Sequence, residues 1–144
     1  MSAITASQNT TTNLKAGVGA GLIGGLVFGM MMAMMGMLPM VSMLVRVENA
    51  VVGFIVHMVI SAVIGAVYGL VAARLPQSAG ATAVAGIANG IIWWVLGALI
   101  MMPLMLGMTN MIFHIGTDQW FSLMGHIIFG LITAFAYIPL SKRL

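Results

Sequence analysis

Charge is the property that this sequence lacks most. Only 5% of its 144 residues are charged, whereas soluble domains carry about 25%. So few charges cannot cover a surface that faces water, but a surface that faces lipid needs none. Hydrophobic residues make up 62% of the chain, and the mean hydropathy is +1.16. The composition therefore predicts an integral membrane protein whose first partner is the lipid bilayer.

Cysteine is absent, which excludes disulfides, thiolate metal ligands and a thiol nucleophile. The net charge of +3 comes from basic residues that form no patch or stripe, so nucleic acid is not an expected partner. Neither a GxSxG nucleophile elbow nor an HExxH helix occurs. The only acidic residues, Glu48 and Asp118, fall in predicted loops. We therefore predict a non-enzymatic protein.

Four stretches are apolar over the length of about 20 residues that a helix needs to cross the hydrocarbon core. We therefore predict an all-α fold, an integral membrane four-helix bundle within residues 16–144, preceded by a polar, flexible N-terminal tail at residues 1–15. The segments between the apolar stretches are polar and broken, as loops are. The predicted spans are about Ala16–Leu38, Ala50–Ala72, Ala81–Leu104 and Trp120–Leu140.

The positive charges are divided unevenly between the two sides of the predicted bundle. Arg46 lies on the side that carries both acidic residues. The other four basic residues lie on the side of the two termini: Lys15, Arg74, Lys142 and Arg143. Cytoplasmic loops carry such an excess of lysine and arginine. We therefore predict a multi-pass protein of the inner (cell) membrane with both termini in the cytoplasm.

The two halves of the chain resemble each other. A shift of 69 residues places His57 on His126, and a shift of 64 places Pro39 on Pro103. The longer second outer loop accounts for the difference between the two shifts. We predict two tandem helix-pair repeats related by a pseudo-twofold axis along the membrane normal. The repeats cover about residues 16–75 and 80–144.

Small residues recur at every fourth position along three of the predicted spans. Close packing over such stripes holds membrane helices together, because lipid provides no hydrophobic effect between them. The chain has more glycine faces than one four-helix bundle needs. We therefore predict packing against further transmembrane helices, as a homo-oligomer or as an accessory or structural subunit of a larger complex. The predicted packing residues are Gly17, Gly21, Gly25, Gly29, Gly53, Ser61, Gly65, Gly69 and Gly130.

Two histidines lie on these small-residue faces, His57 in the second span and His126 in the fourth. Ionisable side chains this deep in a membrane are costly and are functional candidates by default. One interpretation is an electron-transfer subunit that holds a haem b cofactor between the two imidazoles. The alternative is that each imidazole hydrogen-bonds a backbone carbonyl, or Ser61 or Ser122, on its own or a neighbouring helix.

Methionines gather in the outer halves of the first and third spans. Thioethers are soft ligands that suit Cu(I), so another interpretation is a protein that binds or transports a soft metal such as copper, or a small solute. The alternative is that methionine forms helix and fills irregular apolar spaces. The candidate metal ligands, two of which lie near the histidines, are Met34, Met37, Met58, Met101, Met105 and Met124.

The third span carries Asn89, Trp93 and Trp94 near the middle of the bilayer. An indole N–H needs a hydrogen-bond partner at that depth, and Asn89, one turn before Trp93, could provide it. These residues could also line a substrate cavity. We expect instead a polar contact between helices.

From about residue 57 on, several short motifs resemble those of one protein family. They are His57-Met58-Val59-Ile60-Ser61 running on to Tyr68-Gly69, Pro76, Pro103-Leu104-Met105, Gly107-Met108-Thr109 and Gly125-His126-Ile127. Over roughly residues 57–143 the chain is thus similar to the YagU-like bacterial inner-membrane proteins, whose activity is not established. In that family an acidic residue precedes the Gly-His pair by three positions, where this chain has Ser122. The proton-handling role that the family's link to acid stress would imply therefore does not carry over to this position.

Overall fold

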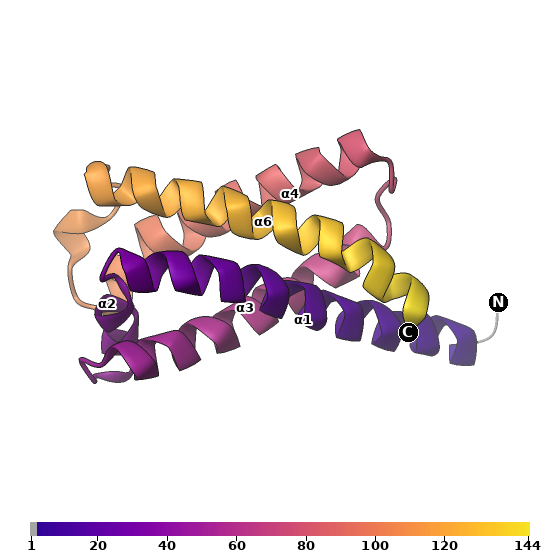
Figure 1. Ribbon diagram of the computed structural model, residues 1–144, viewed down its shortest axis with the longest axis horizontal. Coiled ribbons are helices and arrows are strands. Elements are labelled where there is room, and N and C mark those ends of the chain that lie inside the picture. Colours follow the sequence, from indigo (N-terminus) through magenta and orange to yellow (C-terminus); the bar gives the residue numbers. More distant parts are fainter. Residues whose placement is uncertain (1–2) are drawn as a thin grey trace.

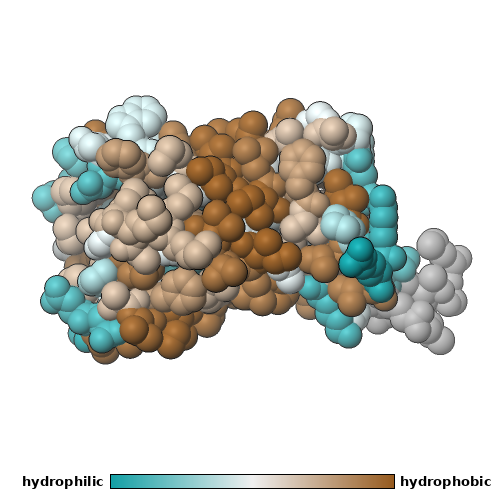
Figure 2. All heavy atoms as spheres, in the orientation of Figure 1, coloured by the Kyte–Doolittle hydropathy of each residue, from teal (hydrophilic) through white to brown (hydrophobic). Residues whose placement is uncertain are grey.

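The chain is a bundle of four long helices. The computed structural model describes the backbone of residues 3–144 and the side chains of residues 9–144. Figure 1 shows the helices lying lengthwise beside one another, and Figure 2 shows an apolar belt across the middle of the molecule between more hydrophilic ends. The helices that are long and apolar enough to cross a membrane are Asn9–Met34, Ala50–Ala72, Ala79–Met105 and Thr117–Arg143. The prediction of an all-α, multi-pass membrane protein is confirmed.

Two helical hairpins make up the bundle, the first from α1 and α3 and the second from α4 and α6 (Figure 1). The bounds of the long helices are α1 (Ala3–Met34), α3 (Ala50–Ala72), α4 (Ala79–Trp93) and α6 (Thr117–Arg143). Short elements lie between them: α2 (Leu38–Ser42), a 3-10 turn η1 (Met43–Val45), a π-helical stretch η2 (Trp94–Met101), α5 (Met102–Met105) and a 3-10 turn η3 (Thr109–Met111). Because η2 and α5 continue α4 without a break, the three together form the third span.

Both chain ends lie at one end of the bundle, here called the terminal end, and α2 lies at the other, the α2 end (Figure 1). Helix α1 packs against α3 and α6, and α4 packs against α6, whereas α3 and α4 touch each other little. Arg74 follows α3, and Lys142 and Arg143 close α6, so these basic residues lie at the terminal end. Glu48 precedes α3 and Asp118 begins α6, at the α2 end.

Contacts between backbones hold the first hairpin together. A Cβ added to Gly21 would lie 2.7 Å from the Cα of Gly65, and one added to Gly17 would lie 2.9 Å from the Cα of Gly69. Real Cβ atoms do not approach other atoms so closely, so only glycine allows α1 and α3 to meet at this distance. The glycine stripes of the two helices therefore face each other.

The second hairpin uses the same kind of contact with fewer glycines. A Cβ added to Gly86 of α4 would lie 2.8 Å from the carbonyl oxygen of Gly130 on α6, and Gly90 lies against the carbonyl of His126. In the first hairpin, Gly29 lies against the ring of Phe54. Each of these glycines therefore allows a helix of the same chain to come close.

The expectation that the glycine faces exceed what one bundle needs is therefore wrong. Helices α1 and α6 each pack against two neighbours and use glycine on more than one face, as Gly24 does against α6. Apart from Gly80 in the first turn of α4, only Gly97 among the glycines of the four spans has nothing within 4 Å of an added Cβ. The bundle itself uses the rest.

The first span ends at Met34 instead of Leu38. Gly36 has a φ of +69°, a conformation that glycine adopts readily and that ends helices. The N–H of Met37 donates a 2.9 Å hydrogen bond back to the carbonyl of Met32, which closes the helix end. The chain then turns into α2, whose Leu38 carbonyl lies against Gly53 of α3.

The chain before residue 16 also differs from the flexible tail that the sequence predicts, although residues 1–2 lie outside the described part. Helix α1 begins at Ala3, and no glycine or proline interrupts it before Ala16. Asn13 is fixed by tertiary contacts, because its carbonyl lies against Gly69 and its Oδ1 accepts a 3.0 Å hydrogen bond from the hydroxyl of Tyr137. Packing therefore extends the first helix beyond its apolar segment.

Candidate functional site

His57 lies in the interface between α3 and α1. It shares one face of α3 with Gly53 and Ser61, four residues away on either side, and this face packs on α1. The Nε2 atom donates a 2.9 Å hydrogen bond to the carbonyl of Gly25, and the Ser61 hydroxyl lies 3.4 Å from the same nitrogen. Because a carbonyl only accepts, Nε2 carries the proton. The imidazole therefore links two helices.

His126 makes its hydrogen bonds within its own helix. Its Nδ1 donates a 2.7 Å bond to the carbonyl of Ser122 and lies 3.4 Å from the Ser122 hydroxyl. Because a carbonyl only accepts, Nδ1 carries a proton. The alternative in which each histidine bonds a carbonyl and a serine is confirmed for both residues.

Phe28 of α1 brings the two histidines into one cluster. Its ring meets the His57 ring edge to face at a centroid distance of 5.3 Å and the His126 ring at 4.9 Å. Gly125 leaves room for this ring, since an added Cβ would collide with it. Phe28 is only 4% exposed, and it fills the space next to both imidazoles. A porphyrin between the two histidines would have to displace Phe28.

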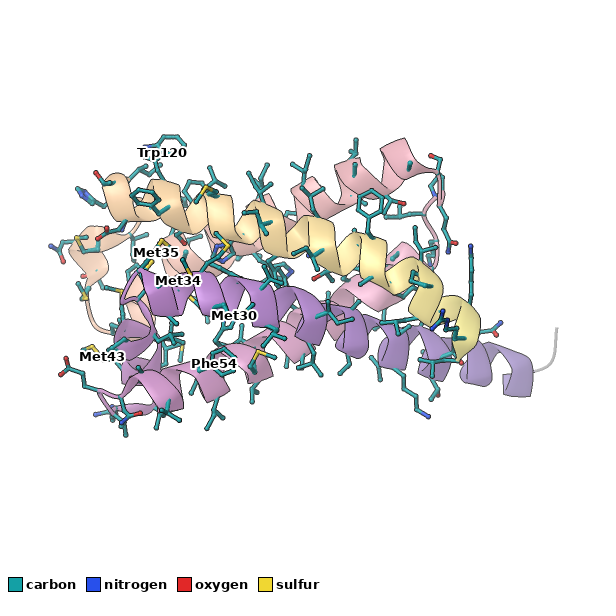
Figure 3. The ribbon with its side chains drawn as sticks, viewed as in Figure 1. Met30, Met34, Met35, Met43, Phe54 and Trp120 are labelled. Atoms are coloured by element: carbon teal, nitrogen blue, oxygen red, sulfur yellow. The ribbon has the colours of Figure 1, made fainter. Side chains whose placement is uncertain are left out.

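The candidate methionine ligands come from every span, and most of them point outward. Met34 is 86% exposed, Met101, Met105 and Met124 are also exposed, and Met37 and Met58 are half-buried. Figure 3 shows Met34 with its neighbours Met30 and Met35 at the α2 end of α1. Within the part of the chain that the structure describes, no three histidine, acidic or cysteine side chains lie close enough to hold a metal ion.

The expected polar contact between helices is confirmed at Trp94, although Asn89 is not its partner. The indole of Trp94 donates a 3.0 Å hydrogen bond to the carbonyl of Gln119, and its ring stacks on Trp120. Asn89 is buried, but its Nδ2 has no hydrogen-bond partner among the described residues, and neither has the hydroxyl of Thr133, which faces Gly24.

Sequence reasoning missed Phe28 and Asn13, because each has a partner on α6 that lies more than 90 residues away. The one available signal was that Phe28 is the single aromatic residue of a glycine-rich first span. The cluster formed by Phe28 and the two histidines is well packed and hydrogen-bonded, so it has the properties of a structural core. Comparisons with models of protein families, with curated proteins and with solved structures find no match to this chain.

Proposed function

We propose that this protein is a non-enzymatic inner-membrane protein that works by packing its third span, around Gly97, against another transmembrane helix. The partner is a second copy of the chain or a subunit of a larger complex. The excess of basic residues at the terminal end supports an orientation with both termini in the cytoplasm. The motifs quoted above support a place among the YagU-like proteins.

The observation that carries the proposal is the open space at Gly97. In lipid, helices associate where small residues let their backbones approach, and the other glycines deep in the spans already have such a neighbour within the chain. Gly97 lies well inside the third span, and an added Cβ there meets nothing within 4 Å. A transmembrane helix from outside the chain would fill this space.

The backbone conformation around Gly97 also supports a contact with another helix at this position. Gly97 lies in η2, and π-helical stretches occur frequently at functional sites. Pro103 has no N–H to donate to the carbonyl of Leu99, which instead accepts a 3.2 Å hydrogen bond from the N–H of Phe113 in the following loop. A tertiary hydrogen bond therefore supports the π-helical stretch η2, and Gly97 faces away from the rest of the bundle.

The natural absence of cysteine allows a clean cross-linking test. A Gly97→Cys variant is oxidised in native membranes with copper phenanthroline, and we expect a covalent homodimer. For a hetero-complex, a bifunctional thiol reagent should instead give a heavier adduct. The matched control is Val63→Cys, since Val63 is 57% exposed on α3. Equal cross-linking of the two variants, together with only monomer in native mass spectrometry in mild detergent, would contradict the proposal.

The alternatives of a soft-metal protein and of a haem-carrying electron-transfer subunit have less support. Phe28 fills the space beside both imidazoles, and the exposed methionines come from several helices. A purified protein without a Soret band would discard the haem. Failure to take up Cu(I) or Ag(I) would discard the metal.

A further inference from the structure

An apolar groove opens at the terminal end of the bundle, where α3 leads into α4. Its volume is about 340 Å³, which lies within the range of roughly 300–1,000 Å³ for ligand pockets. Carbon atoms make up nearly all of its wall, and the residues that line it are Leu75, Pro76, Gly80, Ala81, Val84 and Ala85. The groove lies between the connecting loop and the first turns of α4, where Gly80 and Ala81 carry almost no side chain. Its shape and chemistry suit a hydrocarbon chain.

Positive charge surrounds the end of this groove. Arg74 directly precedes the two lining residues Leu75 and Pro76, and it is exposed. Its guanidinium donates only to the carbonyl of Leu70 on its own helix, at 3.3 Å. The two acidic side chains of the chain lie at the α2 end, a 23-residue helix or more away. Arg74 therefore has no carboxylate partner among the described residues.

Two further basic residues lie at the same end of the bundle. Ile138 of α6 lines a small neighbouring cavity together with Leu75 and Pro76, so the last turn of α6 is close to the groove. Lys142 and Arg143 follow Ile138 by about one turn, and both are exposed. Three basic residues thus lie at the end of the bundle on which the groove opens.

We propose that this groove binds an anionic phospholipid, with one acyl chain along α4 and the headgroup phosphate at Arg74. Basic pockets between transmembrane helices on the cytoplasmic side bind such headgroups. The apolar wall would bind the acyl chain, and the cations without carboxylate partners would favour an anionic headgroup. The proposal goes beyond the helix contact at Gly97 and does not depend on it, because the two surfaces lie on different parts of the third span.

The test uses the full-length protein in mild detergent, with phosphatidylglycerol and phosphatidylcholine of identical acyl chains as probes. Native mass spectrometry measures how much of each lipid stays on the monomer. We expect the protein to retain phosphatidylglycerol several-fold more than phosphatidylcholine. Equal retention of the two lipids would overturn the proposal.

Two variants separate the contributions of the headgroup and the acyl chain. Arg74→Gln should lower the retention of phosphatidylglycerol about fivefold, the effect of one cation near an anionic lipid surface, and leave phosphatidylcholine unchanged. Val84→Trp fills the groove and should lower the retention of both lipids. Because Val84 is exposed, this variant leaves the bundle intact.

The matched control for charge is Arg46→Gln, which removes a cation at the α2 end and should change nothing. Wild-type retention in the Arg74→Gln variant, or in the Val84→Trp variant, would place the lipid elsewhere and refute the proposal. Lipid is counted on the monomer, so this result is independent of cross-linking at Gly97. Either proposal can therefore fail alone.

Discussion

The two hairpins of this bundle are packed differently. In the first, α1 and α3 meet through glycine on glycine along two successive turns and through Gly25 on Ser61 in the next, and the imidazole of His57 bonds across the interface. In the second, Gly86 and Gly90 of α4 meet the single glycine Gly130 on the facing side of α6, and His126 bonds within its own helix. Among the described residues, the buried Nδ2 of Asn89 lacks a hydrogen-bond partner there, and the helix widens at η2.

This difference shows how a membrane protein separates stability from adaptability. Close backbone contacts over several turns fix the first hairpin, because any larger side chain there must push the helices apart. The second hairpin keeps an open glycine in η2, so its third span has room for a further contact. We therefore expect substitutions to affect stability mainly in the first hairpin and association mainly in the second.

The strongest test replaces glycine with leucine in each hairpin. Gly65→Leu should destabilise the bundle by at least about 3 kcal/mol, because the side chain would enter the backbone of Gly17 and Gly21. Gly97→Leu has open space and should change the stability of the monomer by no more than about 1 kcal/mol. Unfolding in mixed detergent micelles measures both. Similar losses in the two variants would refute the distinction between the hairpins.

Phe28 provides the next largest expected effect. Phe28→Ala should cost about 3–5 kcal/mol of unfolding free energy, since it leaves a cavity between the two histidines. The residue that aligns with Phe28 after a shift of 64 is Ile92, which is 52% exposed, and Ile92→Ala should cost about 0.5 kcal/mol or less. The same unfolding measurement compares them. A cost for Ile92→Ala close to that for Phe28→Ala would show that the aligned positions are equivalent.

The two histidines should differ by a smaller amount. His57→Leu removes a hydrogen bond between α3 and α1 and should cost about 1 kcal/mol, in the range measured for bonds between membrane helices. His126→Leu removes a bond within α6 and should cost clearly less. Thermal denaturation in mild detergent ranks the two variants, and the opposite order would contradict the assigned roles.

The smallest expected effect concerns the two aligned prolines. Pro103→Ala restores an N–H that competes for the carbonyl of Leu99, so the N–H of Phe113 should exchange with deuterium faster, while global stability barely changes. Pro39→Ala is the control, because Pro39 lies in the first turn of α2, where no helical hydrogen bond is lost. Hydrogen–deuterium exchange mass spectrometry measures the exchange rate of the loop that contains Phe113. Unchanged exchange at Phe113 would show that Pro103 does not maintain the π-helical stretch.

Local composition was enough to predict the class of fold and most span boundaries. The second span occupies Ala50–Ala72 in both the prediction and the structure, because polar residues flank an uninterrupted apolar run. The early end of the first span was missed, since the φ of Gly36 depends on a helix-closing hydrogen bond that hydropathy does not reveal. Nor does hydropathy reveal the hydrogen bond from Phe113 to the π-helical stretch.

The candidate site was predicted less completely than the fold. The small-residue faces correctly directed His57 towards a neighbouring helix. They could not reveal that Phe28 lies against both imidazoles, because this contact brings together α1, α3 and α6. Nor could they identify Gln119 as the partner of Trp94. The acceptor is a backbone carbonyl, and residue type does not indicate which carbonyl accepts a bond. Contacts between distant segments therefore require the folded chain.

The hydrogen bond between Tyr137 and Asn13 joins residues near the two ends of the chain, and it has a consequence for biogenesis. During synthesis, α1 and α3 can pair in the membrane as soon as both have left the ribosome. The side of α1 that carries Gly24 and Phe28 stays uncovered until α6, the fourth of these spans, packs on it. A chain truncated before α6 would therefore leave this face of α1 uncovered.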